Sequence, residues 1–231
     1  MPLTNAQLVA RACTIAKTPG YTVQAGQYLN MTLQTLCQTY DFDYIKKQQI
    51  ITLNGNQGYA LNSDHLRTKE VFYSVGGVIF YIFQIPIETF NALVEAPGVS
   101  NYPDRFAVDV SQSSTYAPQS TLLFYPPPNL SQTVKVNYFP QMPDISAPET
   151  DTTVCWFTNQ EYLLTKIASM LMLETDDDRQ SSFAVAAEKQ LSNILTMKDD
   201  TEGFSQTIKL SRERFRKGNG SNPNKAFPFG N

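Results

Sequence analysis

The chain has 231 residues, of which 42% are hydrophobic and 17% are charged, and its formal net charge at pH 7 is -3. This length and apolar content are sufficient for a buried core in one large domain or two small ones. The most apolar run, residues 72–87, is too short and too often interrupted by glycine and proline to cross a bilayer, so we expect strands there and no membrane contact.

Two helices are predicted at the start of the chain. Residues 4–7, with the sequence Thr-Asn-Ala-Gln, have the spacing of a capping box, in which the first and fourth residues cap each other's backbone amides. Apolar residues then recur at helical spacing until Pro19-Gly20 ends the pattern. A second amphipathic pattern predicts a helix from about Val23 to Tyr40.

Strand patterns and turn residues dominate the middle of the chain. We predict hairpins around Asn54-Gly55, around Gly76-Gly77 and around the turn at 126–129. A single strand is predicted at 106–110 and a short helix at 87–94. The predicted strand pairs are 49–53 with 58–61, 71–75 with 78–85, and 122–125 with 133–139.

Two further helices are predicted between Thr158 and Lys198. Thr158 to Glu161 has the spacing of another capping box, and apolar residues follow at helical spacing. Three consecutive aspartates, Asp176 to Asp178, suit a helix N-terminus, where the positive end of the helix dipole stabilises negative charge. We therefore predict a turn near Thr175 and a new helix by Asp178. Its apolar face contains Phe183, Ala187, Leu191 and Ile194.

Four amphipathic helices, two at each end of the chain, are buried most economically in a single bundle. We therefore predict an α+β fold in which residues 1–44 and 156–202 form a discontinuous four-helix bundle. Residues 45–155 are predicted to be an inserted antiparallel β-rich subdomain, either a small sandwich or a barrel. Residues 203–231 are predicted to be an extended basic C-terminal arm.

The side chains that could carry catalysis or bind a metal form no recognisable site. His65 is the only histidine, and no nucleophile motif lies near it, so we interpret it as a side chain in a surface loop. Asp176 to Asp178 lack the spacing of a calcium loop. Glu88 and Glu95 could form a glycosidase acid pair, but no cleft is indicated. We predict no catalytic residue, no cofactor and no metal. The three isolated cysteines and the lack of an apolar leader are typical of an intracellular chain.

The last part of the chain is the most informative for function. From Gly203 onward there are six Lys or Arg residues and one acid, a net +5, which leaves -8 for the preceding residues. Large apolar groups interleave with these charges, which favours an arm that becomes ordered on a partner over a solvated terminus. The same composition could also follow a nucleic-acid backbone. The predicted partner-binding residues are Phe204, Ile208, Leu210, Arg212, Arg214, Phe215, Arg216, Lys217, Phe227 and Phe229.

The order of these elements resembles the head-to-tail adaptor, or head-completion, proteins of tailed bacteriophages, most closely those of short-tailed phages. The residues that carry the resemblance are 156–163, which lead into the third helix after a proline-rich return. Residues 173–178, before the fourth helix, add to it. The large β-rich insertion departs from the smallest members of that family, which are little more than the bundle.

The resemblance implies a structural protein of the virion, located between head and tail and assembled in the host cytoplasm. Such adaptors form a homo-oligomeric ring, usually twelvefold, beneath the portal protein, and their C-terminal arms extend along the portal. Their other surface receives a tail nozzle or tail-fibre proteins, and duplex DNA passes through the lumen. An acidic body suits this role, because tight binding of DNA phosphates needs clustered Lys and Arg. A weakly negative wall would instead let the DNA slide through the lumen. A murein-degrading virion enzyme and a DNA-binding protein that uses the basic tail are the alternative functions.

Overall fold

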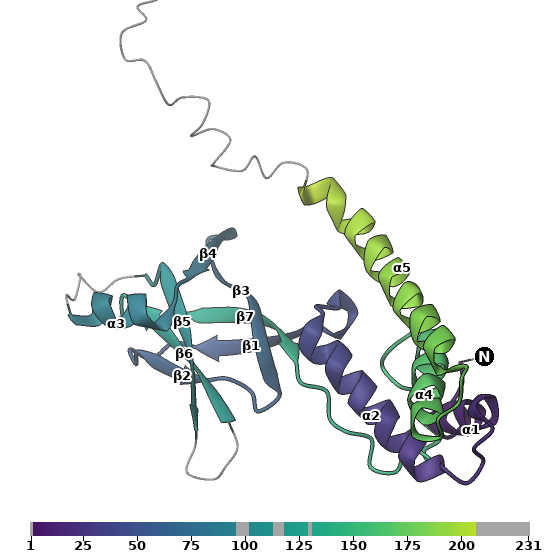
Figure 1. Ribbon diagram of the computed structural model, residues 1–231. Coiled ribbons are helices and arrows are strands. Elements are labelled where there is room, and N and C mark those ends of the chain that lie inside the picture. The colour runs from purple at the N-terminus through teal and green to yellow at the C-terminus, as the bar shows by residue number, and fades with distance from the viewer. Residues whose placement is uncertain (1, 96–101, 113–117, 129–130, 207–231) are drawn as a thin grey trace, which may run out of the picture.

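The computed structural model describes residues 2–95, 102–112, 118–128 and 131–206. Figure 1 shows the strands gathered on one side of the molecule, with α3 beside them, and the other long helices on the opposite side. The helices are α1 (Asn5–Ala16), α2 (Thr22–Thr39), the short 3-10 helix η1 (Asp43–Ile45), α3 (Ile87–Glu95), α4 (Gln160–Glu174) and α5 (Gln180–Gln206). The strands are β1 (Lys47–Thr52), β2 (Gly58–Ala60), β3 (His65–Val75), β4 (Val78–Gln84), β5 (Arg105–Gln112), β6 (Pro118–Tyr125) and β7 (Thr133–Pro140).

The helices α1 and α4 each begin at a side-chain cap. Thr4 caps α1, since its hydroxyl accepts from the backbone amide of Gln7 at 3.3 Å and the Gln7 side chain accepts from the Thr4 amide at 3.1 Å. The predicted capping box at 4–7 is therefore confirmed. The box predicted at Thr158 is wrong, because α4 is capped one residue later. The side chain of Asn159 accepts from the amide of Tyr162 at 2.9 Å.

The helix α4 lies at the centre of the helical part, with α1, α2 and α5 packed against it. Its residues Leu163, Ile167 and Leu171 are 0% exposed. The helices α1 and α2 also pack against each other, whereas α5 packs mainly against α4. It buries Leu191 but leaves Val185 69% exposed. The four helices form an open cluster, because α2 and α5 stand apart on either side of α4.

The seven strands form one mixed sheet in the order β1-β7-β3-β4-β5-β6-β2. The pair β4–β5 is parallel and every other pair is antiparallel. The sheet curls towards a barrel, and a side chain bridges its two edge strands. The Gln49 amide on β1 donates to the carbonyl of Ala60 at 3.1 Å and accepts from the amide of Asn62 at 3.0 Å. The curled sheet encloses a second apolar core, which contains Val71, Phe106, Leu122, Phe124, Val134 and Val136.

Only one of the three predicted hairpins is present. The strands β3 and β4 pair directly around Gly76-Gly77, with Val75 opposite Val78. Both glycines have positive φ, 57° and 85°, which glycine adopts without steric cost. The hairpin predicted around Asn54-Gly55 is wrong, because β1 pairs with β7 and β2 pairs with β6. The last predicted hairpin is also wrong, because β6 pairs with β5 and β2 while β7 lies between β1 and β3.

The predicted fold class, a four-helix bundle with an inserted antiparallel subdomain, is therefore wrong. The described residues contain five α-helices and a seven-stranded mixed sheet with its own core. The fifth helix, α3, packs against β5 and β6 and belongs to the sheet. The last helix also continues to Gln206, past Gly203, where the arm was expected to begin. An apolar stripe predicts that one face of a helix is buried. It does not specify which element packs on that face, so it does not establish a closed four-helix bundle.

Arg67 joins the sheet to the helices. It lies on β3, and its guanidinium forms an ion pair with Asp41 at 2.6 Å. It also donates to the backbone carbonyls of Cys37 and Tyr40 at 3.1 and 3.3 Å, and to that of Gln38. These carbonyls lie at the end of α2, where a helix has no backbone donors of its own to satisfy them. Arg67 therefore caps α2 and fixes its orientation relative to β3.

Candidate interaction surfaces

The ten residues predicted to bind a partner lie at or beyond the end of the described chain. Phe204 belongs to α5, but its side chain lies outside the described part of the structure. The other nine, from Ile208 to Phe229, lie outside the described residues. Their role in binding therefore stays a prediction.

His65 lies in a polar cluster at the start of β3 and not in the surface loop that the sequence suggested. Its ring lies 5.4 Å from the ring of Tyr138, and its Nε2 is 2.9 Å from the hydroxyl of Thr68. The Tyr138 hydroxyl donates to Asp64 at 2.9 Å, and Lys47 forms an ion pair with the same carboxylate at 2.6 Å. These contacts tie β1, β3 and β7 together, which indicates a structural role.

Burial and hydrogen bonding together set the protonation of this cluster. It lowers the pKa of His65 below its ordinary value of 6.5, although a backbone hydrogen bond and the charge of Asp64 partly offset the effect. Burial also acts to raise the pKa of Asp64, but hydrogen bonds from Lys47 and Tyr138 outweigh it and the net shift is downward. Near neutral pH the histidine is therefore neutral and the carboxylate is charged.

We expect His65 to make the folded chain less stable as the pH falls below its ordinary pKa of 6.5. In that range the unfolded chain takes up a proton on His65 before the folded chain does, whereas above it both states are neutral and the effect vanishes. The melting temperature of the His65→Asn variant should therefore fall less than that of the wild type between about pH 7 and pH 5. Parallel pH profiles for the two proteins would contradict this assignment.

The carboxylates considered for catalysis or metal binding have other surroundings. Asp177 accepts from the amide of Arg179 at 2.9 Å and from its guanidinium at 2.7 Å, and this side-chain bond lowers the pKa of Asp177 to about 2. This pair lies just before α5, which begins at Gln180 and not at Asp178 as predicted. Glu88 is exposed in the first turn of α3. Within the described ranges, no group of three His, Cys, Asp or Glu side chains could hold a metal ion.

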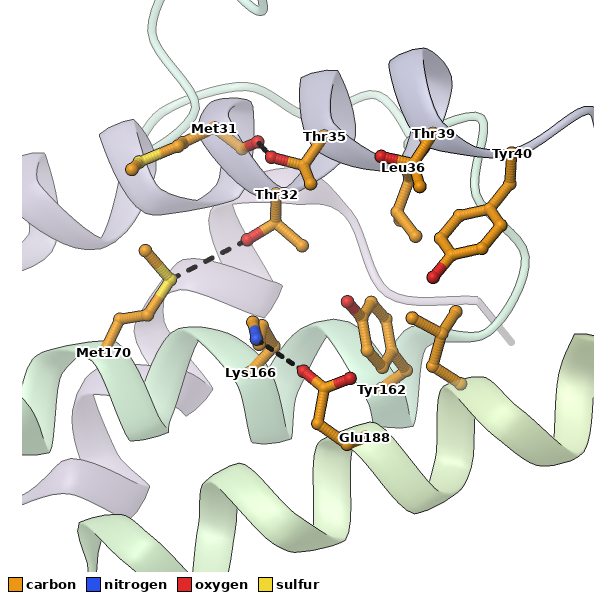
Figure 2. Close-up of a pocket in the computed structure, with 11 residues that line it drawn as sticks. Met31, Thr32, Thr35, Leu36, Thr39, Tyr40, Tyr162, Lys166, Met170 and Glu188 are labelled. Atoms are coloured by element: carbon orange, nitrogen blue, oxygen red, sulfur yellow. Dashed lines mark hydrogen bonds and ion pairs between the residues drawn. The ribbon is translucent and has the colours of Figure 1, made fainter.

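A groove of about 330 Å³ lies between α2, α4 and α5 (Figure 2). The ion pair between Lys166 and Glu188, 2.8 Å long, links α4 to α5 within the groove. Burial, with a smaller effect of Glu188 and Tyr40, raises the pKa of Tyr162 to about 12, so this phenol stays neutral. The groove thus combines methionine and leucine side chains with neutral hydroxyls. Its lining residues are Met31, Thr32, Thr35, Leu36, Thr39, Tyr40, Tyr162, Lys166, Met170, Glu188 and Leu191.

The hairpin of β3 and β4 exposes an unusually apolar surface. From Val71 to Ile87 the chain contains no Asp, Glu, Lys or Arg. Ile82 is 4% exposed and packs in the sheet core, whereas Phe83 is 70% exposed. The exposed residues lie on both faces of the hairpin, with Val75, Val78 and Phe80 on the face of Ile82, and Ile79, Tyr81 and Phe83 on the opposite face.

The outer edge of β4 is also largely unpaired in the described part of the chain. The strand β5 pairs with β4 only at Phe83 and Gln84. The amide of Phe83 donates to Asp104 on this side at 2.9 Å. Because backbone groups alternate along a strand, those of Ile79 and Tyr81 point to the same side, beyond the end of the pairing. Exposed apolar strands of this kind are typical of interaction surfaces.

Comparison with known proteins shows the family to which the chain belongs. No helix in the described ranges is both long and apolar enough to cross a membrane. None of the curated proteins compared matches the chain. A family model described as the SU10 adaptor protein matches residues 3–210, which confirms the resemblance to phage head-to-tail adaptors. Because this match spans both the helices and the sheet, the chain belongs to the SU10 adaptor protein family.

Proposed function

We propose that the protein forms a ring, usually twelvefold in such adaptors, that joins the portal to the tail of a bacteriophage. The observation that carries this proposal is the family match over residues 3–210. In this role the protein is a structural part of the virion and not an enzyme. Copies assemble in the host cytoplasm, bind the portal on one side and receive tail nozzle or fibre proteins on the other.

The distribution of charge supports this function. The residues before Gly203 carry a net charge of -8, whereas those from Gly203 onward carry +5. A ring lumen formed by the acidic part would repel DNA phosphates weakly, so that the duplex passes without stable binding. The basic residues that follow would instead reach acidic groups on a protein partner, which increases the rate and specificity of association.

The exposed surfaces support a role in protein assembly. The segment from Val71 to Ile87 is neutral and apolar, as interface cores are, and has no cations with which to bind nucleic acid. The predicted arm supplies phenylalanines, of which Phe215, Phe227 and Phe229 lie beyond α5. Buried aromatic anchors contribute much of the affinity in protein interfaces. We therefore assign portal binding to the arm, from Phe204 to Phe229.

The size and symmetry of the particle formed with the portal protein of the same phage would test this function. We expect electron microscopy of the purified mixture to show an added ring, coaxial with the portal, which is absent from portal alone. The channel through the added ring should be continuous with that of the portal and wide enough for duplex DNA. A chain that stays unbound in the presence of assembled portal would contradict the proposal.

A further inference from the structure

The groove between α2, α4 and α5 is largely apolar and stays open in the described part of the chain. Met31 lines it and is 54% exposed, although methionine is among the residues most often buried. Its volume of about 330 Å³ lies at the lower end of the range for ligand pockets, which is about 300–1,000 Å³. This is room for two large side chains and not for a whole helix or hairpin. An occupant should therefore present two apolar side chains close together.

The sequence beyond α5 contains a pair of this kind. Phe227 and Phe229 flank Pro228, and no other two aromatic residues after Gln206 lie so close together. Proline fixes its own φ angle and favours an extended backbone at the residue before it. In an extended chain, alternate side chains lie on the same side. The pair is therefore partly preorganised to enter a groove with both rings.

The distance from the groove to the end of α5 matches the reach of this pair. Glu188 and Leu191 line the groove on α5, about 22–27 Å from Gln206 at about 1.5 Å per residue. Phe227 follows Gln206 by 21 residues, and a random coil of this length has a root-mean-square end-to-end distance of about 25 Å. The effective concentration of a linked group is greatest when this distance matches the span. Chain length thus favours the groove of the same copy.

The other large apolar residues of the arm fit the groove less well. Ile208 and Leu210 follow Gln206 so closely that a fully extended chain carries them at most about 14 Å, at about 3.6 Å per residue. Phe215 spans the distance only if the chain before it is mostly extended, and it offers a single ring. Reach and pairing together therefore select Phe227 and Phe229.

The distribution of charge adds to this fit. The residues before Gly203 carry a net charge of -8 and those from Gly203 onward carry +5, so the arm is attracted to its own body. Within the groove, Lys166 donates to one carboxylate oxygen of Glu188, whose side chain is 62% exposed. The other oxygen can accept from Lys225, which precedes Phe227 by two residues.

We propose that, before portal binding, Phe227 and Phe229 dock in the α2–α4–α5 groove of their own copy. This inference rests on the proposed attachment of the arm to the portal and adds a competing state. The two phenylalanines cannot occupy the groove and a portal pocket at the same time, so docking lowers the fraction of chains that are competent to bind. The free chain is thereby held back from premature association. Assembled portal releases the arm, because it offers the same rings many repeated sites.

Fluorescence quenching in the free chain tests the docking. A bimane fluorophore is attached to a Thr39→Cys variant, since Thr39 is exposed and lines the groove (Figure 2). The three native cysteines are buried and should react slowly. Tryptophan quenches bimane on contact, so we expect Phe227→Trp to reduce the emission by at least about twofold. Phe215→Trp is the control and should leave the emission nearly unchanged, and the native Trp156 is common to both variants.

A matched pair of substitutions tests the effect on portal binding. Thr35 in the groove and Thr14 on α1 are both exposed, and each donates its hydroxyl to the carbonyl four residues earlier. Lysine at either position adds the same charge to a helix. We expect Thr35→Lys to fill the groove, abolish the quenching and accelerate association with immobilised portal by at least about threefold. Thr14→Lys should leave both nearly unchanged, and equal melting temperatures would establish that both variants fold.

Every other result overturns the docking. Unquenched bimane in the Phe227→Trp variant would do so and leave the proposed function intact. Quenching only at high protein concentration, or between separate labelled and Trp-bearing chains, would place the arm in the groove of another copy. Slower association of Thr35→Lys would assign the groove to direct portal contact, and an unchanged rate would show that docking does not restrain binding. If the wild type did not bind portal at all, the proposed function would fail, and quenching in the free chain would still decide the docking.

Discussion

Replacing Leu171 with alanine should lower the free energy of unfolding of the helical part by about 2–5 kcal/mol. Leu171 is 0% exposed on α4, the helix against which α1, α2 and α5 all pack. Its removal leaves a cavity, and the surrounding helices can relax only partially to fill it. Ile167 on the same helix is also 0% exposed and should show a loss of similar size.

A second leucine on the same helix provides a matched control. Leu173 is 67% exposed, so Leu173→Ala removes the same atoms from α4 with the same change in helix propensity. We expect it to change stability by less than about 0.5 kcal/mol. Denaturant titration can be followed through the only tryptophan, Trp156, whose ring lies 5.9 Å from that of Phe42 in the helical core. Equal midpoints for the two variants would contradict the central position of α4.

Deleting residues 207–231 should abolish stable attachment to the portal while leaving the body folded. The deletion removes all six basic residues that follow Gly203 and keeps α5 to its described end at Gln206. Each phenylalanine of the arm can contribute on the order of 2 kcal/mol if it is fully buried in a portal pocket. Repetition around a ring multiplies the loss, because each bound arm raises the effective concentration of its neighbours.

Two partial variants separate the contributions of the arm. Replacing Phe215, Phe227 and Phe229 with serine should mainly increase the dissociation rate, because it removes apolar anchors. Replacing Arg212, Arg214 and Arg216 with glutamine should mainly slow association and weaken its dependence on salt. Surface plasmon resonance on immobilised portal measures both rates. Undiminished binding of the full deletion would show that the body, and not the arm, carries the portal interface.

Sequence reasoning succeeded where the determining interactions are local. The cap at Thr4 and the hairpin at Gly76-Gly77 each depend on residues within a few positions, so their patterns are sufficient. The turn signals at Asn54-Gly55 and at 126–129 are equally local, but the strands on either side of each signal pair elsewhere. Lys47 lies opposite Tyr138, far along the chain. Such pairings depend on how apolar faces meet in the closed sheet, which a turn signal does not encode.

The candidate surfaces could not be predicted from the sequence for a related reason. The run from Val71 to Ile87 predicts strands, but its hydrophobicity alone suggests a core position. Only the pairing pattern reveals that β5 leaves most of β4 uncovered. The groove likewise depends on the separation of α2 from α5, whereas the sequence pattern of Leu191 and its neighbours suggested a closed bundle.

The length of α5 sets the distance from the body, and the angle about the helix axis, at which the chain continues beyond Gln206. Its 27 residues span about 40 Å at about 1.5 Å per residue, and Figure 1 shows its end standing clear of the other helices. Inserting one residue in this free part would rotate everything beyond it by about 100°, whereas seven residues would shift it by about 10 Å with only about 20° of rotation. If the protein forms the proposed ring, the length of α5 would fix the angle of the residues beyond it, and we expect changes in this length to be tolerated mainly in steps of two turns.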